Sequence, residues 1–310
     1  MLQYTIRRLL WLPILLAVMV FITFVLGFYG PGGPEVVLLG QRFDPEVAEI
    51  IREQWGMNDP FFVQYFRYLR NYATLNFGES LLVRPAYPVS ELILQRLPIS
   101  LQLNAAALSI GIPGGIVLGI IAAFNRGNLI DRSIIFTTTL IRAIPTLVAV
   151  PLLIFIFAYQ IRIVPPGGWD GIFSTSAILP VLWMASGAFG GYARLTRASI
   201  LEVLSSDYVR TGRAKGLSET LLMYRHVLRN AFIPLVTFLG FALGGLIEGT
   251  LLIETLFGIP GLGRLFFEAI SSRDYPIVVA SVVMAAVSFA LANLWADLFY
   301  GIIDPRIRNT

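Results

Sequence analysis

The residue types that usually perform catalysis are scarce in this chain. Its 310 residues include one histidine, His226, one lysine, Lys215, and no cysteine. A phosphate-binding P-loop needs a lysine that follows a glycine-rich turn and precedes Ser or Thr, whereas Lys215 stands between Ala214 and Gly216. His226 lacks the partners of a metal site or of a nucleophile pair, and no Gly-x-Ser-x-Gly motif occurs. We therefore expect no enzymatic activity, no bound metal and no cofactor.

The charged residues gather instead in one polar segment, 194–234, that has long apolar runs on both sides. It carries seven basic side chains: Arg194, Arg197, Arg210, Arg213, Lys215, Arg225 and Arg229. Short loops on the cytoplasmic side of a membrane are enriched in Arg and Lys. The pattern therefore predicts a cytoplasmic loop.

Capping signals divide this segment into two short helices. Asp207 is expected to accept from the free N–H groups of a helix over 208–215, and Gly216 is expected to end that helix in a left-handed conformation. Ser218 can cap a second helix, which we expect to run until Pro234. The prediction is a helix, a glycine turn and a second helix.

The composition of the whole chain is that of a polytopic membrane protein. It is 56% hydrophobic and 14% charged, with a mean hydropathy of +0.74. The net charge of +4 comes mostly from arginines near the ends of apolar runs, so it reports membrane topology and not nucleic-acid binding. We predict an all-α protein with about six transmembrane helices.

Apolar stretches place those spans, and the arginines orient them. The predicted spans are 9–28, 99–124, 134–159, 177–192, 233–256 and 277–300. More arginines flank the predicted inner ends than the short outer loops, which predicts a multi-pass protein of the cell membrane with both termini in the cytoplasm. Glycines in the second, fourth and fifth spans, including Gly187, Gly190 and Gly191, predict close helix packing.

The segment 30–98 is predicted to form a helical loop outside the membrane. Asp44 before Pro45 and Asp59 before Pro60 are both typical of helix starts, and Gly56 is expected to close the first helix. The second helix is expected to have an apolar face formed by Phe62, Tyr65, Phe66 and Leu69. That face can pack within the protein or against a sister subunit, or it can contact a binding protein.

Four charged residues fall within or beside the predicted spans and are candidates for the transport pathway: Arg142, Glu248, Glu254 and Asp297. A charge in the hydrocarbon costs several kcal/mol unless it faces protein or water. Arg142 lies close enough to the inner end of its span to reach the interface instead. Glu254 is expected near the outer interface, and Glu248 can line the pathway, lie at a subunit interface or pair with Arg142.

Several stretches together resemble a known family. They are DYVRTGRAKGLSETLLMYRHVLRNAFIP in the polar segment, QRLPISLQL before the second span, ETLFGIPGLGRLFFEAISSRDYP after the fifth and NLWADLFYGIIDPRIR near the end. The chain resembles the permease subunits of binding-protein-dependent ABC importers, in the form used for dipeptides and oligopeptides. Gly212 stands where that family pattern leads us to expect Ala, and Glu248 where we expect a small residue.

The resemblance implies an ABC importer type I permease fold and several partners. These are a related second permease that completes a heterodimer, two ABC ATPase subunits and an extracytoplasmic substrate-binding protein. The helix in the polar segment would sit in a groove of the ATPase. It implies coupling roles for Asp207, Tyr208, Val209, Arg210, Gly212, Arg213, Ala214, Lys215, Gly216 and Leu217. Of these, Tyr208, Val209, Ala214 and Leu217 would supply apolar contacts, and the basic residues would meet an acidic rim.

The expected division of the chain is 1–29 for the tail and first span, 30–98 for the outer loop, and 99–310 for the core that contains the coupling loop 194–234. Di- or oligopeptides are the expected cargo, with nickel, glutathione or oligosaccharide as alternatives known among similar permeases. An ion-coupled secondary transporter using Arg142, Glu248 and Asp297 is a further alternative, and it would not need the helix pair of the polar segment. A basic loop can also simply fix topology or contact anionic lipid.

Overall fold

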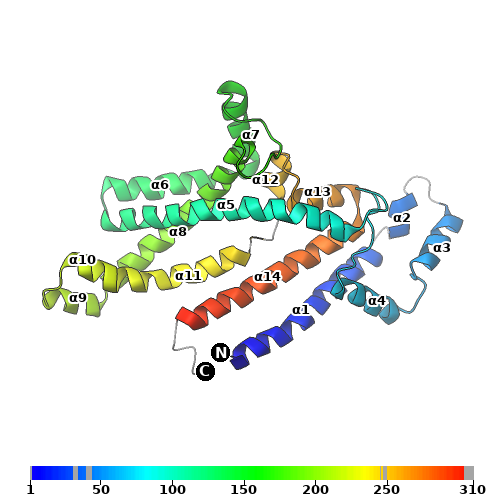
Figure 1. Ribbon diagram of the computed structural model, residues 1–310, viewed down its shortest axis with the longest axis horizontal. Helices are drawn as coiled ribbons and strands as arrows, with labels where there is room; N and C mark the ends of the chain where they lie inside the picture. Colours follow the sequence, from blue (N-terminus) through cyan, green and yellow to red (C-terminus); the bar gives the residue numbers. More distant parts are fainter. Residues whose placement is uncertain (1, 31–33, 40–43, 245, 247–249, 304–310) are drawn as a thin grey trace. The chain divides into compact units, whose positions relative to one another are not determined.

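The computed structural model describes residues 2–30, 34–39, 44–244, 246 and 250–303 (Figure 1). These residues form helices, with one isolated β-bridge between Glu79 and Pro88. The all-α prediction is confirmed for this part of the chain. The chain divides into two compact units: unit 1 comprises Met1–Ser100, Ile247–Thr255 and Pro260–Leu291, and unit 2 comprises Leu101–Leu246, Leu256–Ile259 and Ala292–Thr310.

Unit 1 is built around the first and last long helices. Its elements are α1 (Leu2–Phe28), α2 (Pro34–Leu39), α3 (Pro45–Gln54), α4 (Phe61–Ala73), the start of α5 (Val89–Phe124), α12 (Leu251–Leu256), α13 (Leu262–Ser272) and most of α14 (Tyr275–Ile303). Asp44 caps α3 as predicted, since its Oδ1 accepts from the Glu46 N–H at 2.9 Å, and Gly56 follows the helix with φ +62°. The cap of α4 is Pro60 and not Asp59, whose carboxylate pairs with Arg67.

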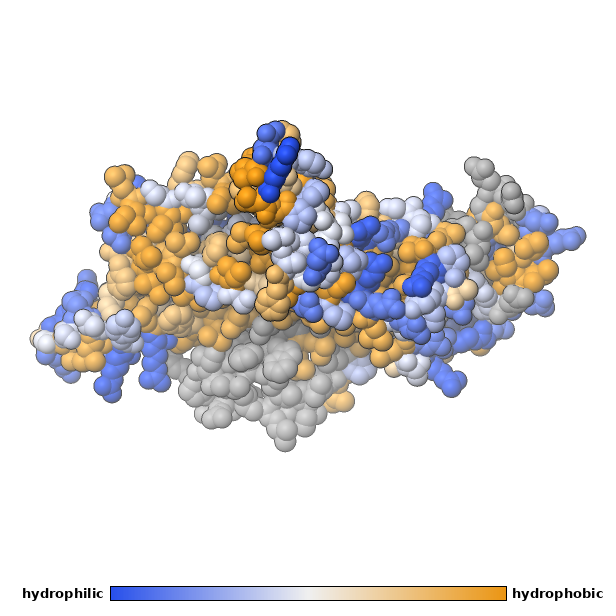
Figure 2. Space-filling model, turned by 45° about the horizontal axis from the view of Figure 1, so that its top comes forward, coloured by the Kyte–Doolittle hydropathy of each residue, from blue (hydrophilic) through white to orange (hydrophobic). Residues whose placement is uncertain are grey.

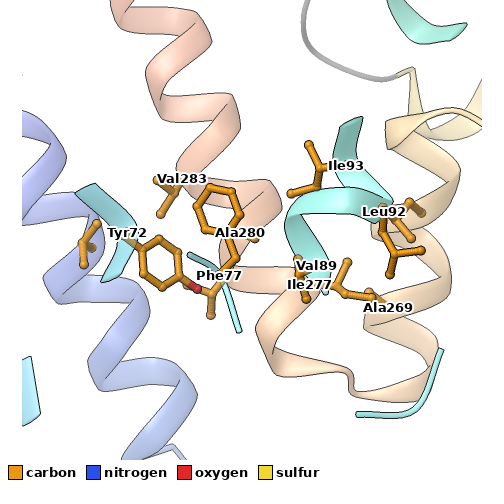
Figure 3. Packing of buried hydrophobic residues seen from close by; sticks show 12 residues of the cluster. Tyr72, Phe77, Val89, Leu92, Ile93, Ala269, Ile277, Ala280 and Val283 are labelled. Carbon is orange, nitrogen blue, oxygen red and sulfur yellow. The ribbon is translucent and has the colours of Figure 1, made fainter. Parts of the chain in front are cut away.

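A cluster of buried apolar side chains from α4, α5, α13 and α14 forms the core of unit 1 (Figure 3). Tyr65, Tyr68 and Tyr72 turn α4 inward, and the Tyr65 hydroxyl donates to the Ala17 carbonyl oxygen of α1 at 2.9 Å. Two residues of the predicted apolar face of α4, Tyr65 and Leu69, pack against this core. The other two, Phe62 and Phe66, are 69% and 62% exposed, so whether they contact a sister subunit or a binding protein stays a prediction.

Unit 2 holds the long helices that follow Ser100. They are the rest of α5, α6 (Leu129–Ala143), α7 (Thr146–Ile154), the π-helix η2 (Phe155–Gln160), the 3-10 turn η3 (Thr175–Ala177), α8 (Ile178–Leu204), α9 (Asp207–Ala214), α10 (Glu219–Leu222), the π-helix η4 (Met223–Leu228) and α11 (Arg229–Gly244). α8 packs against both α6 and α11. It is the central helix of this unit.

The predicted third span is broken in the structure. α6 and α7 with η2 differ in direction by 95°. The break falls at Ile144, whose ψ of 119° is extended, and at Pro145, which caps α7. The ring of a proline disfavours helical backbone in the residue before it, so the Ile144–Pro145 pair stops the helix.

The fourth and fifth spans also have different limits from those predicted. α8 continues through Arg194 and Arg197 to Leu204, so these arginines lie on a helix and the loop proper begins after it. Pro234 lies inside α11 and does not end the helix there. Neighbouring groups in a membrane protein can satisfy the backbone that a proline frees, which explains the tolerance. α11 ends at Gly244, and α12 begins only at Leu251.

Length and hydropathy identify two helical stretches of the described residues that can each cross a membrane, Val89–Phe124 and Thr175–Leu204. The bent pair Leu129–Ala143 with Thr146–Gln160 is a third candidate, and Pro13–Phe28 and Tyr275–Leu291 are shorter apolar helices. Figure 2 shows hydrophobic residues over much of the visible surface of α5 and α6, whereas hydrophilic residues gather over α9 and α10. Every predicted span coincides at least in part with a helix.

Three glycines of α5 allow α8 to approach closely. A Cβ atom on Gly111, Gly115 or Gly119 would lie 2.6 to 2.7 Å from atoms of α8. This repeat of small residues at every fourth position confirms the predicted close packing. Gly187 does not take part, because a Cβ atom there would meet nothing within 4 Å, whereas one on Gly190 would lie 3.1 Å from the Thr138 carbonyl oxygen of α6.

Candidate functional site

The helix predicted in the polar segment is present as α9, with small differences at its start. Its cap is Ser206, and Asp207 is the first helical residue. Lys215 follows the helix, and Gly216 has φ +75°, the left-handed conformation expected for it. The Gly216 N–H donates to the Arg213 carbonyl oxygen at 2.9 Å, and the Leu217 N–H donates to that of Gly212 at 3.2 Å, so the turn uses the last free carbonyls.

One side of α9 is built into the interior of unit 2. Val209 is fully buried in a cluster with Ile200 of α8, Leu222 of α10, Val227 of η4 and Ala231 of α11. Val209 therefore offers no contact to a partner, contrary to the prediction. Leu217, also expected to offer one, is half-buried against the same cluster.

Gly212 lies on this buried side, three residues after Val209. A Cβ atom at Gly212 would approach Leu222 Cδ1 to 2.7 Å. Gly212 therefore lies close to the buried side chain of Leu222, which explains why a glycine stands where Ala was expected. An alanine would require Leu222 to move.

The opposite side of α9 is exposed and basic. Arg210, Arg213 and Lys215 are exposed there, together with Tyr208 and Ala214. Asp207 is also exposed, and its Oδ1 lies 3.7 Å from Arg210 Nη1. An exposed pair of this kind adds little stability, so both charges stay available to a partner.

Two contacts fix this side to the following helices, and the sequence pattern does not predict either. Arg213 donates from Nε to Glu219 Oε1 at 2.7 Å across the glycine turn, which raises the pKa of the Arg213 guanidinium. The Tyr208 hydroxyl accepts from Asn230 Nδ2 of α11 at 3.0 Å. Ser218 caps α10 as predicted, with its Oγ accepting from the Leu221 N–H at 3.4 Å. The residues of the Arg213–Glu219 and Tyr208–Asn230 pairs are not at helical spacing, so the turn after α9 is needed to bring each pair together.

A buried ion pair joins α6 to α8 ahead of α9. Arg197 donates from Nε to Asp131 Oδ1 at 2.6 Å and from Nη2 to Asp131 Oδ2 at 2.8 Å. Asp131 is buried, and its Oδ2 also accepts from the Gly127 N–H at 2.9 Å. Two parallel hydrogen bonds to one carboxylate fix the orientation of both side chains. Sequence spacing gives no sign of this pair, which spans 66 residues.

Three of the four predicted pathway residues lie on described helices: Arg142 on α6, Glu254 on α12 and Asp297 on α14. Arg142 is exposed at the end of α6. A Cβ atom added at Gly190 of α8 would lie 3.3 Å from Arg142 Cδ. Arg142 forms no ion pair with any described carboxylate. Asp297 lies in α14, and Glu248 lies outside the described residues, so the predicted pairing of Glu248 with Arg142 stays a prediction.

Glu254 is fully buried in unit 1 and lines no open surface there. Its Oε1 accepts from the Ser100 hydroxyl at 2.9 Å and from the Thr250 N–H at 3.1 Å, and its Oε2 accepts from the Arg264 N–H at 3.1 Å. The Ser100 hydroxyl oxygen in turn accepts from the Leu262 N–H at 2.8 Å. This carboxylate holds the turn between α12 and α13 against the start of α5. Its predicted place near the outer interface, and its candidacy as a pathway or intramembrane polar residue, stay predictions.

The chain matches two protein-family models. Residues 115–309 match the model of the binding-protein-dependent transport system inner membrane component, and residues 1–104 match the N-terminal model of the same membrane component. The chain belongs to this permease family. The permease is similar over 99% of both chains to the oligopeptide transport system permease protein AppB of Bacillus subtilis, at 37% identity. It is 35% identical to OppB of Salmonella typhimurium over 99% of this chain and 100% of that protein.

A solved structure supports the fold of the permease. The inward-facing MetNI methionine ABC transporter matches 69% of this chain and 97% of the compared chain, with a TM-score of 0.52 and 16% identity. The permease is thus the inner-membrane component of a binding-protein-dependent ABC transporter and not its ATPase, which confirms the prediction from the missing P-loop. It is one subunit of a system that also includes ATPase and binding-protein components.

Proposed function

We propose that this permease forms part of the translocation pathway of an ATP-driven importer of di- and oligopeptides. The support is its 35–37% identity, over nearly the full length, to permeases named for oligopeptide transport. In this proposal the permease pairs with a related permease as a heterodimer, binds two ABC ATPase subunits and receives substrate from an extracytoplasmic binding protein. Both of its termini lie in the cytoplasm, as its arginine distribution indicates.

The coupling element in this proposal is α9, and one observation carries it. α9 exposes Arg210, Arg213 and Lys215 on one side and buries Val209 on the other, against side chains of α8, η4 and α11. A displacement of α9 by a partner on its exposed side therefore also displaces the helices packed against Val209. Packed interiors resist deformation, so α8 and α11 must move with α9.

The proposed mechanism follows from this attachment. ATP closes the two ATPases, each ATPase carries the helix docked in its groove, and α9 moves α8 and α11. Because the spans of each permease move in this way, access to the pathway switches from one side of the membrane to the other. Arg142, Glu248 and Asp297 remain candidates for polar groups along that pathway. The bonds of Glu254 favour a structural role for that residue.

Charge reversal tests the docking side of α9. Arg210 and Lys215 are exposed, and no described residue holds Lys215 in an ion pair. Arg210→Glu with Lys215→Glu is expected to abolish co-purification of the ATPases and ATP-driven uptake, because like charges would face the acidic rim of the groove. Arg70→Glu, an exposed residue of α4 on the predicted outer side, is the control. Unchanged ATPase binding by the α9 variant would remove α9 from the coupling role.

Reconstitution tests the activity as a whole. Proteoliposomes that contain both permeases and both ATPases, supplied with the binding protein, are expected to accumulate a labelled oligopeptide only with ATP. The permease alone should hydrolyse no ATP. Accumulation driven by a proton or sodium gradient without ATP would support the secondary-transporter alternative. Accumulation of nickel, glutathione or an oligosaccharide in place of the peptide would contradict the peptide cargo.

A further inference from the structure

A groove between α6 and α8 lies apart from the docking side of α9. It has a volume of about 590 Å³ and is lined from α6 by Asp131, Arg132, Ile135, Phe136 and Thr139, and from α8 by Arg194 and Arg197. Both helices belong to unit 2. Its lining residues fall within 131–139 of α6 and 194–197 of α8. The start of α6 and the end of α8 are the predicted cytoplasmic ends of the two helices.

The groove carries an excess of positive charge. Its lining contains three arginines and one carboxylate, which gives the groove a net charge of +2. Asp131 is neutralised by Arg197, which it holds in two hydrogen bonds of 2.6 and 2.8 Å. Arg132 and Arg194 therefore face the groove with no carboxylate among its lining residues left to neutralise them.

Two features orient these charges toward a bound group. Arg194 donates from Nη1 to the Thr139 hydroxyl oxygen at 3.2 Å, which holds the guanidinium across the groove from α6. The Thr139 hydroxyl hydrogen stays available to an acceptor. An arginine keeps several N–H donors after one hydrogen bond, and it is the side chain best suited to phosphate oxygens.

Apolar side chains lie beside these polar groups. Phe136 is 67% exposed, and Ile135 is half-buried in the same groove. Leu140, one turn after Phe136 on α6, is also exposed. A ligand that matches the groove thus combines an anionic head with an apolar tail.

The geometry points to a binding site for the phosphate headgroup of an anionic phospholipid, with Arg132, Arg194 and Thr139 on the phosphate and Phe136 on an acyl chain. Basic pockets between membrane helices on the cytoplasmic side have the chemistry to bind such headgroups. The headgroup would bridge α6 and α8 next to the Asp131–Arg197 pair, and α8 leads directly to α9. This inference depends on the predicted orientation of α6 and α8 and not on α9 binding an ATPase.

The test is phosphatidylglycerol binding to the full-length chain, measured by native mass spectrometry in a neutral detergent. Arg132→Gln with Arg194→Gln should weaken the tightest bound lipid about 25-fold, since each arginine near an anionic headgroup contributes about fivefold. Arg197 is kept, because its loss would leave Asp131 buried without its cation. Arg225→Gln with Arg229→Gln, which removes the same charge from exposed positions of η4 and α11, should leave this binding within about twofold of the parent chain.

Two further arms identify the ligand. Phe136→Ala should weaken phosphatidylglycerol, and phosphatidylcholine of the same chain length should bind at least tenfold more weakly than phosphatidylglycerol. Equal binding by the parent and the groove variant would overturn the proposal, as would equal losses in the groove and control variants. Displacement of the lipid by millimolar inorganic phosphate would indicate a free-phosphate site and overturn the assignment to a lipid. Lipid binding is measured without ATPases, so its outcome is independent of the proposed coupling.

Discussion

The hydroxyl of Ser80 donates to Asp274 Oδ2 at 2.6 Å, although the two residues lie 194 positions apart in the chain. The same oxygen accepts from the backbone N–H groups of Leu81, Leu82 and Val83 at 3.1, 2.9 and 3.0 Å. Successive N–H groups that converge in this way form a concavity suited to an anion. Asp274 directly precedes α14, so its carboxylate ties the segment before α5 to the start of the last helix.

We predict that Asp274→Ala destabilises unit 1. Four donors would lose their acceptor in a buried site, and hydrogen bonds to a charged group contribute about 1.5 to 3 kcal/mol each without being additive. A loss of at least about 3 kcal/mol is expected, seen as a lower melting temperature of the purified chain in detergent. Asp274→Asn should retain part of the stability, and Asp170→Asn, at an exposed aspartate, should retain all of it. Equal melting temperatures for Asp274→Ala and the parent would contradict the structural role.

The Glu254→Ala variant distinguishes a structural role of Glu254 from a role in the transport pathway. Glu254→Ala should reduce the amount of folded permease, because Ser100 and the N–H groups of Thr250 and Arg264 would lose their acceptor. Gly261→Ala should act in the same direction, since its Cβ atom would come within 2.3 Å of Glu254 Oε2. Size-exclusion chromatography of the detergent extract measures the folded fraction. A Glu254→Ala permease that folds normally and fails only in transport would restore the pathway role.

The Asp131–Arg197 pair should behave as a unit. Arg197→Ala leaves the buried Asp131 carboxylate without its cation and should cost about 3 kcal/mol, which is the lower end for a broken buried pair because Arg197 is partly exposed. Asp131→Asn with Arg197→Gln should be less destabilising than Arg197→Ala alone. Thermal unfolding of Asp131→Asn, of Arg197→Gln and of the variant with both substitutions gives the coupling energy between the residues. Additive effects would show that the two side chains contribute independently.

Gly216 offers a test of the turn alone. A Cβ atom at this position would meet nothing within 4 Å, so substitutions act only through the backbone, whose φ is +75°. Gly216→Val should cost about 1 to 2 kcal/mol and weaken both ATPase co-purification and uptake, because a β-branched residue is strained there. Asparagine adopts the left-handed conformation more readily than valine, so Gly216→Asn should keep most of the ATPase co-purification and most of the uptake. Normal assembly and uptake by Gly216→Val would mean that this turn does not set the position of α9.

The absence of cysteine makes the topology directly measurable. Phe173→Cys, in the predicted outer loop before α8, and Thr220→Cys, in α10, place single thiols at exposed positions. A membrane-impermeant maleimide added to intact cells should label the first, and it should label the second only after the membrane is opened. Labelling of Thr220→Cys in intact cells would refute a cytoplasmic α9. Reporters fused after Gln64 and after Lys215 should give the same orientation, outside and inside respectively.

The sequence alone determined the class of the protein, its helical fold and the position of α9. Long apolar stretches force helices because backbone groups in lipid must pair within the chain. Local chemistry also fixed the cap by Ser218 and the left-handed turn at Gly216, since both depend on residues a few positions apart. The missing P-loop correctly excluded the ATPase role for the same reason, because that motif is contiguous.

Only the tertiary structure decided which faces the helices bury and which distant residues pair. On α4 the core side includes Tyr65 and Leu69, which the pattern predicted, and also Tyr68 and Tyr72, which it did not, since periodicity gives a face only to within a neighbouring residue. Val209 is apolar in a basic helix, and either a partner or the chain itself could have covered it; packing against Ile200 and Val227 settled this. The carboxylates of Asp131, Asp274 and Glu254 found their donors through folding, because hydrogen bonds between remote segments leave no periodic trace in the sequence.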